Sequence, residues 1–333
     1  MKLKQALKAG AGWCYLHNPL SRRLQTDGVI LMLHRVIADD RQAALPHRRE
    51  LCIGNQSFER LLRWLRRHFD CVPLMELLDP HAGPTGRLRV ALTFDDGWRD
   101  NASQAFPLLQ RYDMPASIFL STDFIGTRRH FWWESIGETL WGRHGAAARE
   151  ALWARLGEMG MAPPPAVREA RDATARSAAL ADFLQALKGL PGGALQALAD
   201  SCPADDEPHA LDWEQVRALE ASGLVRFGPH GASHTILTQL DAGQLERELH
   251  DSSEVLRQRC RYPLPVYCYP NGNHDEAVRR RLGSHRFRYA LSTRPGLVRA
   301  RQDQLALPRI GVSQLNAGRP SLLAWRMLQG ERA

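Results

Sequence analysis

Short apolar segments of strand type alternate with helical segments along most of this 333-residue chain. Residues 90–94 and 116–120 are two such apolar segments, and residues 101–112 between them have a helical pattern. Strands that are apolar on both faces and separated by helices are typical of a parallel sheet with crossover helices. The alternation therefore predicts an α/β fold.

The same alternation continues on both sides of these segments. We expect further strands at residues 28–36, 71–74, 225–228, 265–269, 289–292 and 307–310. We also expect helices at residues 57–68, 212–222, 239–259 and 274–283, the first capped by Ser57 and the second by Asp212.

Residues from about 127 to 210 interrupt this alternation. They show little strand pattern, contain many alanines and leucines, and carry breakers at residues 163–165 and 191–193. We interpret them as a helical insertion. The chain is then an N-terminal helical extension, residues 1–27, followed by a single domain, residues 28–333, which the insertion interrupts.

Charge and cysteine content exclude several classes of protein. The formal net charge is +8, but the arginines are scattered and form no array with aromatic residues, so we expect no nucleic-acid partner. The six cysteines show no CxxC spacing, and we expect free thiols. The sequence contains no run of about 18 apolar residues, the length that could span a membrane, and we expect a cytoplasmic protein. Residues 1–17 could be a plain surface helix or could lie on an anionic membrane at its inner face.

Two adjacent carboxylates, Asp95 and Asp96, follow the apolar segment of residues 90–94. Adjacent residues of a strand point to opposite faces, so both acids can share a site only where the chain leaves the strand, and Gly97 allows that turn. Like charges this close repel each other unless a cation or strong hydrogen bonds offset the repulsion. A divalent metal held by one carboxylate, with the other free as a base, would do so. A solvated turn is the alternative.

Two histidines, His230 and His234, follow another predicted strand at a spacing that lets two imidazoles converge on one ion. Together with the two aspartates they form an Asp/His/His set at the carboxyl ends of predicted strands, where α/β folds place their sites. Three protein ligands that leave open coordination positions are typical of a catalytic divalent site. Zinc suits these ligands best, although cobalt, nickel or iron could occupy the same ones.

The block Thr93-Phe94-Asp95-Asp96-Gly97, followed by His230-Gly231-Ala232-Ser233-His234, resembles the first two motifs of the polysaccharide deacetylase family, the NodB-type carbohydrate esterase family 4. The resemblance covers roughly residues 28–125 and 211–312 and leaves the insertion outside it. The family usually has Ser or Thr where Gly231 stands. The resemblance implies a distorted (β/α)7-type barrel that removes acetyl groups from sugars.

The resemblance also implies roles for the motif residues: Asp95 is the general base, and Asp96, His230 and His234 are the metal ligands. The family's third motif normally carries an arginine that orients the base, but this chain has Cys268-Tyr269-Pro270-Asn271-Gly272 there. We predict that Arg309 replaces that arginine. A structural arginine on the surface is the alternative.

A Leu-x-His motif near the C-terminus normally supplies the family's general acid, and that motif is missing from this sequence. His34, in Met32-Leu33-His34, could replace it, as in circularly permuted members of the branch that contains the poly-N-acetylglucosamine deacetylases. The first and last strands of a closed barrel are neighbours, so permutation leaves the site geometry intact. We therefore predict that His34 protonates the leaving amine. A structural histidine is the alternative.

We expect aromatic and turn residues near these motifs to contact the sugar. The predicted contacts are Trp98, Tyr269, Pro270, Asn271, Trp132 and Trp133. The backbone N–H of Asn271 could also donate to the developing oxyanion. The cluster Phe131-Trp132-Trp133 could instead anchor the insertion by burying a large apolar area.

The resulting prediction is a metal-dependent hydrolase that removes an acetyl group from an N-acetylated sugar in a polysaccharide, oligosaccharide or glycolipid precursor. Two alternatives stay open: hydrolysis of a non-sugar amide on the same fold, and a non-catalytic glycan-binding protein. The free base Asp95 argues against the binding protein, which has no use for such a group. The oligomeric state also stays open.

Overall fold

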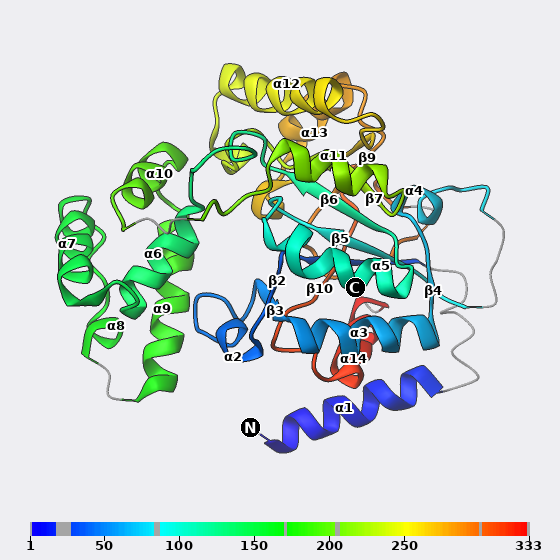
Figure 1. The fold of residues 1–333 in the computed structure, drawn as a ribbon, viewed down its shortest axis with the longest axis horizontal. Helices are drawn as coiled ribbons and strands as arrows, with labels where there is room; N and C mark the ends of the chain where they lie inside the picture. The colour runs from blue at the N-terminus through cyan, green and yellow to red at the C-terminus, as the bar shows by residue number, and fades with distance from the viewer. Residues whose placement is uncertain are drawn as a thin grey trace.

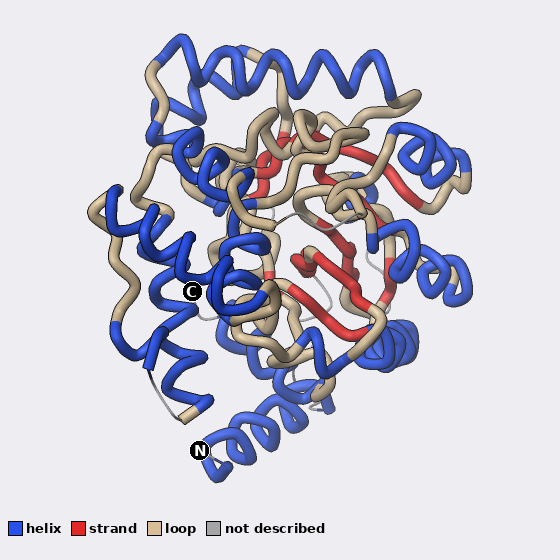
Figure 2. The backbone as a smooth tube through the Cα atoms, turned by 60° about the vertical axis from the view of Figure 1, so that its left-hand side comes forward, coloured by secondary structure: helices blue, strands red, loops and turns tan. Residues whose placement is uncertain are grey.

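Parallel strands form the centre of the molecule, and helices lie outside them (Figures 1 and 2). The structure, a computed structural model, describes residues 2–17, 28–82, 87–169, 172–203, 207–299 and 302–331. The predicted α/β class is confirmed.

The main sheet has the strand order β10-β1-β5-β6-β7, and all its pairs are parallel. A short strand, β4, pairs with the first two residues of β5. The strands of this sheet are β1 (Gly28–Leu33), β4 (Asp70–Cys71), β5 (Arg89–Phe94), β6 (Ala116–Leu120), β7 (Val225–Pro229) and β10 (Ile310–Gly311). The strand predicted at residues 71–74 ends early, because Pro73 precedes a short helix, α4 (Leu74–Leu77).

Two further strands, β8 (Val266–Cys268) and β9 (Tyr289–Leu291), form a separate parallel pair between the two edges of the main sheet. On one side, the N–H of Leu264 donates to the carbonyl of Phe227 in β7 at 2.7 Å. On the other side, Leu307 forms a bridge to Leu291, just before β10. Within the described residues, seven strands, β1 and β5 to β10, therefore go round a distorted barrel, as the family resemblance implies. Its last joints are a single hydrogen bond and a short bridge rather than full ladders.

The first and last strands of the barrel are neighbours. In the register of β1 and β10, Leu31 pairs with Ile310 and Met32 pairs with Gly311. Residues from the two ends of the domain therefore reach the same site.

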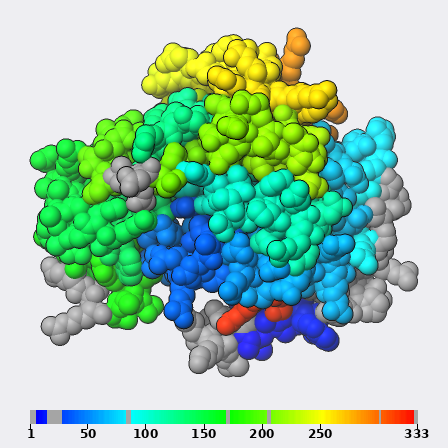
Figure 3. All heavy atoms as spheres, in the orientation of Figure 1, coloured from blue at the N-terminus to red at the C-terminus, as the bar shows by residue number. Residues whose placement is uncertain are grey.

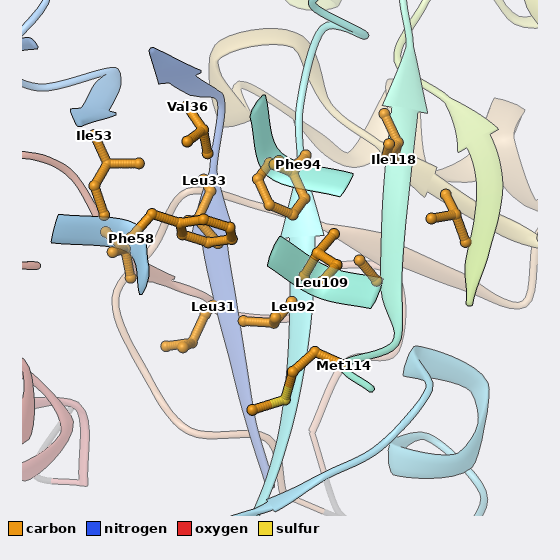
Figure 4. Close-up of a cluster of buried hydrophobic side chains, with 14 of the residues drawn as sticks. Leu31, Leu33, Val36, Ile53, Phe58, Leu92, Phe94, Leu109, Met114 and Ile118 are labelled. Carbon is orange, nitrogen blue, oxygen red and sulfur yellow. The ribbon is translucent and has the colours of Figure 1, made fainter. Parts of the chain in front are cut away.

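Strand residues alternate between the barrel interior and the helices outside it. Leu92 and Phe94 of β5 pack outward in the cluster drawn in Figure 4, against Phe58 of α3 (Asn55–His68) and Leu109 of α5 (Phe106–Tyr112). Ala91 belongs to the interior cluster instead. Since side chains repeat every second residue, Thr93 and Asp95 continue this inward row.

Helix α3 begins two residues before its predicted start, and its N-cap is Gly54 rather than Ser57. The Ser57 hydroxyl donates to Asp40 of α2 (Asp40–Ala43) at 2.6 Å, so Ser57 joins two helices and the predicted cap is wrong. The cap predicted at Asp212 is confirmed, because its carboxylate accepts the Gln215 N–H at 2.7 Å in a capping box.

The remaining elements of the barrel domain connect and cover the strands. Residues 101–112, predicted as one helix, begin with a π-helical turn, η2 (Asn101–Ala105), before α5. The other elements are β2 (Arg35–Ile37), β3 (Cys52–Gly54), α11 (Trp213–Ala221), η3 (Leu237–Gln239), α12 (Ala242–Arg259), η4 (Pro270–Gly272) and α13 (Glu276–Ser284).

The chain between β6 and α11 is helical, as the sequence predicts for residues 127–210. Its helices are α6 (Trp132–Trp141), α7 (Gly145–Glu158), α8 (Pro165–Glu169), α9 (Ala173–Leu187) and α10 (Gly192–Asp200). They share a hydrophobic cluster separate from that of the barrel. They form the lobe at the left of Figure 1, and Figure 3 shows this lobe in green beside the blue segment that contains α2 and β3.

The N-terminal helix α1 (Lys2–His17) packs along α14 (Pro320–Glu331). The helices approach closely at Gly12, where an added Cβ would lie 2.0 Å from the carbonyl oxygen of Ser321. Residues 18–27 of the predicted extension lie outside the described residues. No helix in the described part of the chain has both the length and the apolar character needed to cross a membrane.

Candidate metal centre and active site

The two carboxylates at the end of β5 reach one site because the backbone turns between them. Asp95 continues the inward row of β5, and Asp96 has φ 75°, in the left-handed region, followed by Gly97 with φ 84°. This turn brings the Asp96 carboxylate to the same end of the barrel as His230, which follows β7. A left-handed aspartate is a strained conformation, of a kind that clusters at functional sites.

Asp96, His230 and His234 converge on one point. Asp96 Oδ1 lies 3.3 Å from His230 Nε2 and 3.2 Å from His234 Nε2. Ligands at about 2.0–2.1 Å from a tetrahedral zinc ion are about 3.3 Å apart, so the spacing suits such an ion. All three residues are buried or nearly so. The structure thus brings together the three predicted metal ligands.

Neighbouring groups orient these ligands. His230 Nδ1 lies 2.8 Å from the carbonyl of Cys268, and an N–H donated there leaves the Nε2 lone pair toward Asp96. Trp98 Nε1–H donates to Asp96 Oδ2 at 2.7 Å. The other oxygen, Asp96 Oδ1, is buried and accepts no hydrogen bond from any described residue. A buried carboxylate oxygen without a partner is costly, and a cation would stabilise it.

Two other clusters of ligand-type side chains do not suit a metal. In Asp95/His230/Cys268, Asp95 is paired with Arg309, and burial raises the pKa of Cys268, which keeps its thiol protonated. In His47/Glu134/Glu138, guanidinium groups already neutralise the carboxylates. The ion pairs of this second cluster are Arg35–Glu134, Arg48–Glu134, Arg48–Glu138 and Arg143–Glu138.

Arg309 holds the Asp95 carboxylate through two parallel hydrogen bonds. Nη1 donates to Oδ1 and Nη2 donates to Oδ2, each at 2.7 Å. The guanidinium is fully buried and also donates to Thr93 Oγ1 and to the carbonyl of Ser292. Burial would raise the pKa of Asp95, but Arg309, together with His230 and His34, more than offsets this and the pKa falls to about 2. Arg309 is therefore no surface arginine, and Asp95 is an ionised carboxylate of fixed orientation.

Cys268 stands where the polysaccharide deacetylase family, which this sequence resembles, normally has the arginine that orients the base. Cys268 also contacts Asp95. Its Sγ lies 3.4 Å from Asp95 Oδ1. A neutral thiol cannot supply the missing positive charge, so the charge beside Asp95 comes from Arg309, on the segment that leads into β10.

His34 follows β1 and lies beside Asp95. Its Nε2 is 3.9 Å from Asp95 Oδ2, beyond hydrogen-bond distance, and its side chain is 15% exposed. Burial lowers the pKa of His34, while Asp96 and Asp95 act in the opposite direction. A protonated His34 is therefore a stronger acid than a free imidazolium. His34 and Asp95 line the same cavity.

A cavity of about 430 Å³ opens in front of these groups. This volume is within the range of about 300–1,000 Å³ of small-molecule sites. The barrel side contributes Met32, His34, Asp95, Asp96, His230, His234, Asn271 and Thr293. The opposite side comes from the β2–β3 connection and the insertion, through Pro46, His47, Glu50, Leu51, Trp132, Trp133, Ala181, Leu184, Gln185 and Lys188.

The predicted sugar contacts divide into two groups. Trp132, Trp133 and Asn271 line the cavity. Among the described residues, the backbone N–H of Asn271 has no backbone acceptor. Asn271 has φ 55°, in the left-handed region. Trp98, Tyr269 and Pro270 are buried and do not line it, so we correct their assignment as sugar contacts.

Of these three residues, Trp98 supports the site from behind. Trp98 positions Asp96 and packs against Phe131 with ring centroids 4.3 Å apart. The Tyr269 hydroxyl donates to the carbonyl of Leu305. Phe131, fully buried, acts as the anchor of the insertion, whereas its neighbours Trp132 and Trp133 face the cavity.

Glu248 of α12 supports the loop that carries the two histidines, and the sequence pattern did not single it out. Its carboxylate accepts the N–H of Ala232 at 2.8 Å, the N–H of Ser233 and the Ser233 hydroxyl. A Cβ added at Gly231, whose φ is 76°, would lie 3.1 Å from Glu248 Oε2. The left-handed backbone and the nearby carboxylate both favour glycine at position 231, where the family usually has Ser or Thr.

We predict that Glu248→Ala weakens binding of a divalent metal about 10- to 100-fold, because the loop that presents His234 loses its acceptor. Competition with a chromogenic chelator measures this affinity. Glu254→Ala, on the same helix, is the matched control, because Glu254 pairs at the surface with Arg257 and Gln258 of its own helix. Equal metal affinity in the two variants would contradict the prediction.

Fold and site together define the class: a parallel α/β barrel with a buried Asp/His/His cluster, able to hold a metal ion, at the carboxyl ends of its strands. Residues 82–290, more than half of the chain, match the polysaccharide deacetylase family. The chain therefore belongs to this family, and the resemblance seen in the sequence is confirmed.

Individual relatives agree with this assignment. YxkH of Bacillus subtilis (strain 168), named as a polysaccharide deacetylase, is 27% identical over 147 residues, which are 43% of this chain and 48% of that protein. The match thus spans about half the length of this curated relative.

Solved structures show the same fold at low sequence identity. The Streptococcus pyogenes deacetylase PplD, in complex with acetate, is 17% identical with a TM-score of 0.57, over 92% of this chain and 98% of that one. IcaB from Ammonifex degensii is 17% identical with a TM-score of 0.55, over 91% of this chain and 98% of that one.

Proposed function

We propose that this protein is a divalent-metal-dependent hydrolase that removes the acetyl group from an N-acetylated sugar. The substrate is a polysaccharide, an oligosaccharide or a glycolipid precursor. The observation that carries the proposal is the pair of buried carboxylates with different partners. Asp96 Oδ1 faces two imidazoles without a hydrogen bond, whereas Asp95 is held by Arg309. Membership of the polysaccharide deacetylase family supports it.

The metal would be held by Asp96, His230 and His234, and zinc fits this donor set best. When bound, such an ion supplies a Lewis acid that polarises a carbonyl group and makes water a better nucleophile. Two histidine nitrogens and one carboxylate oxygen leave a position open for substrate or water, which is the arrangement of a catalytic site.

Asp95 accepts the proton of the attacking water. Its pairing with Arg309 lowers its basicity but keeps it ionised and fixes the plane of its carboxylate. Catalysis by a positioned base depends first on geometry and then on pKa. The bidentate pair therefore favours orientation over basicity.

His34 donates a proton to the leaving nitrogen, and Asn271 stabilises the developing oxyanion through its backbone N–H. Both line the cavity beside Asp95 and Asp96. Because burial lowers the pKa of His34, its imidazolium gives up a proton readily. The backbone N–H of Asn271 lies in a left-handed turn at the cavity wall. Such an N–H can stabilise charge that develops on an oxygen.

Acetate release from N-acetylglucosamine oligomers tests the proposal. We expect activity that disappears on treatment with a chelator and returns on addition of zinc, and no activity in Asp96→Ala. Activity that survives both metal removal and Asp96→Ala would overturn the mechanism. Turnover of simple acetamides without any turnover of acetylated sugars would instead assign the site to non-sugar amides.

A further inference from the structure

Lys188 lines the cavity and carries a positive charge that the proposed reaction does not use. The chain has lysines only at positions 2, 4, 8 and 188. Lys188 is therefore the single lysine outside the N-terminal helix α1. Lys188 follows the last residue of α9 and lines the cavity wall opposite the barrel. It also lines a smaller adjoining pocket with His234 and Asn271. The insertion thus places a positive charge at the metal centre.

Lys188 differs from the other cations around the site because it has no ion-pair partner among the described residues. Arg35, Arg48 and Arg309 each lie 2.7 Å or less from a carboxylate oxygen. The acids whose charges act on Lys188 are Asp96, a predicted metal ligand, and Glu50, which is exposed. Burial lowers the pKa of Lys188 and these two acids raise it. A partly buried ammonium group is thus left with unused hydrogen-bond donors.

The surroundings of Lys188 strengthen an electrostatic contact there. Trp132, Ala181 and Leu184 form an apolar part of the same wall. Opposite charges attract more strongly beside such a wall than in bulk water. An ion pair between Lys188 and exposed Glu50 would contribute little stability, so a ligand could displace it easily.

We propose that Lys188 forms an anion subsite, and that the substrate is an N-acetylated sugar carrying a negatively charged group close to its acetamide. A phosphate ester and a carboxylate share this chemistry. The inference rests on the proposed function, since the acetamide must lie at the metal centre for the charge to reach Lys188. It adds a preference for a negatively charged substrate, which the barrel residues alone do not impose.

The test compares the zinc-loaded protein on three substrates: N-acetylglucosamine as the neutral reference, N-acetylglucosamine 1-phosphate, and N-acetylmuramic acid with its carboxylate. We expect kcat/KM for at least one anionic substrate to exceed that for the neutral one. In Lys188→Met, the ratio of anionic to neutral kcat/KM should fall about 10- to 100-fold. Lys188→Arg should keep most of the ratio, and Lys8→Met, which removes an exposed lysine of α1, should keep all of it.

The outcomes separate this inference from the proposed function. A ratio that is equal in wild type and Lys188→Met overturns the anion subsite, because damage to the fold would lower both rates and leave the ratio unchanged. A preference for phosphate over carboxylate, or the reverse, identifies the source of the charge. If none of the sugars is turned over, the proposed function fails. Equilibrium binding of the same three sugars, wild type against Lys188→Met, then still decides whether Lys188 recognises the charge.

Discussion

Asp95→Asn is expected to lower the rate of acetate release by about 10²- to 10⁴-fold, the range that a positioned general base contributes. Asparagine has nearly the same shape as aspartate but cannot take a proton from water. The metal ligands Asp96, His230 and His234 remain, so zinc should still bind with a stoichiometry of about one. Acetate release and metal content measured on the same preparation give both quantities.

Asp113→Asn is the matched control for this loss. Asp113 is exposed at the end of α5 and has a left-handed backbone that asparagine also tolerates. Its activity should equal that of the wild type. If Asp95→Asn keeps more than about a tenth of the wild-type rate, Asp95 is not the base.

Arg309→Met is expected to reduce the free energy of unfolding by about 3–5 kcal/mol, the usual cost of removing one partner of a buried ion pair. The Asp95 carboxylate would stay buried without its two 2.7 Å hydrogen bonds, and Thr93 and the carbonyl of Ser292 would lose donors. Urea denaturation at neutral pH measures the loss. Activity should fall as well, because Asp95 loses its fixed orientation.

A double variant shows whether the loss comes from the unpaired carboxylate. Arg309→Met together with Asp95→Asn should be less destabilised than the sum of the two single variants, since neither partner leaves a buried charge. Arg111→Met, which breaks an exposed pair with Glu59, should cost only about 0–1 kcal/mol. A loss below about 1 kcal/mol for Arg309→Met would contradict the role of this pair.

Local sequence patterns predicted the main elements of the barrel and the two motifs of the metal centre. Asp95-Asp96-Gly97 and His230 to His234 are short segments, and strand periodicity together with turn chemistry shows where each lies. The same reasoning was wrong for Trp98 and Tyr269. An aromatic residue beside a motif can face the cavity or support it from behind, and only the packing of neighbouring elements decides between these positions.

Residues that act through distant contacts gave weaker signals. Glu248 lies on a helix whose pattern is that of an ordinary surface helix, and its contact with Ala232 depends on how α12 crosses the histidine loop. Lys188 did carry a signal, as the single lysine far from the N-terminus. Nothing in the sequence showed that the insertion folds back over the site and presents this residue to the cavity.

Sequence alone thus determined the fold class, the helical nature of the insertion and the residues able to bind a metal, because hydrophobic periodicity and ligand spacing are local properties. Only the tertiary structure decided between the two roles open to Arg309, a partner of Asp95 or a surface arginine. Arg309 is 214 residues away from Asp95 in the chain and reaches it because β1 and β10 are neighbours in the barrel. Contacts of this kind depend on strand order and register, which no local pattern contains. The two adjacent carboxylates were visible from the start, but their different environments come from the order in which the strands lie side by side.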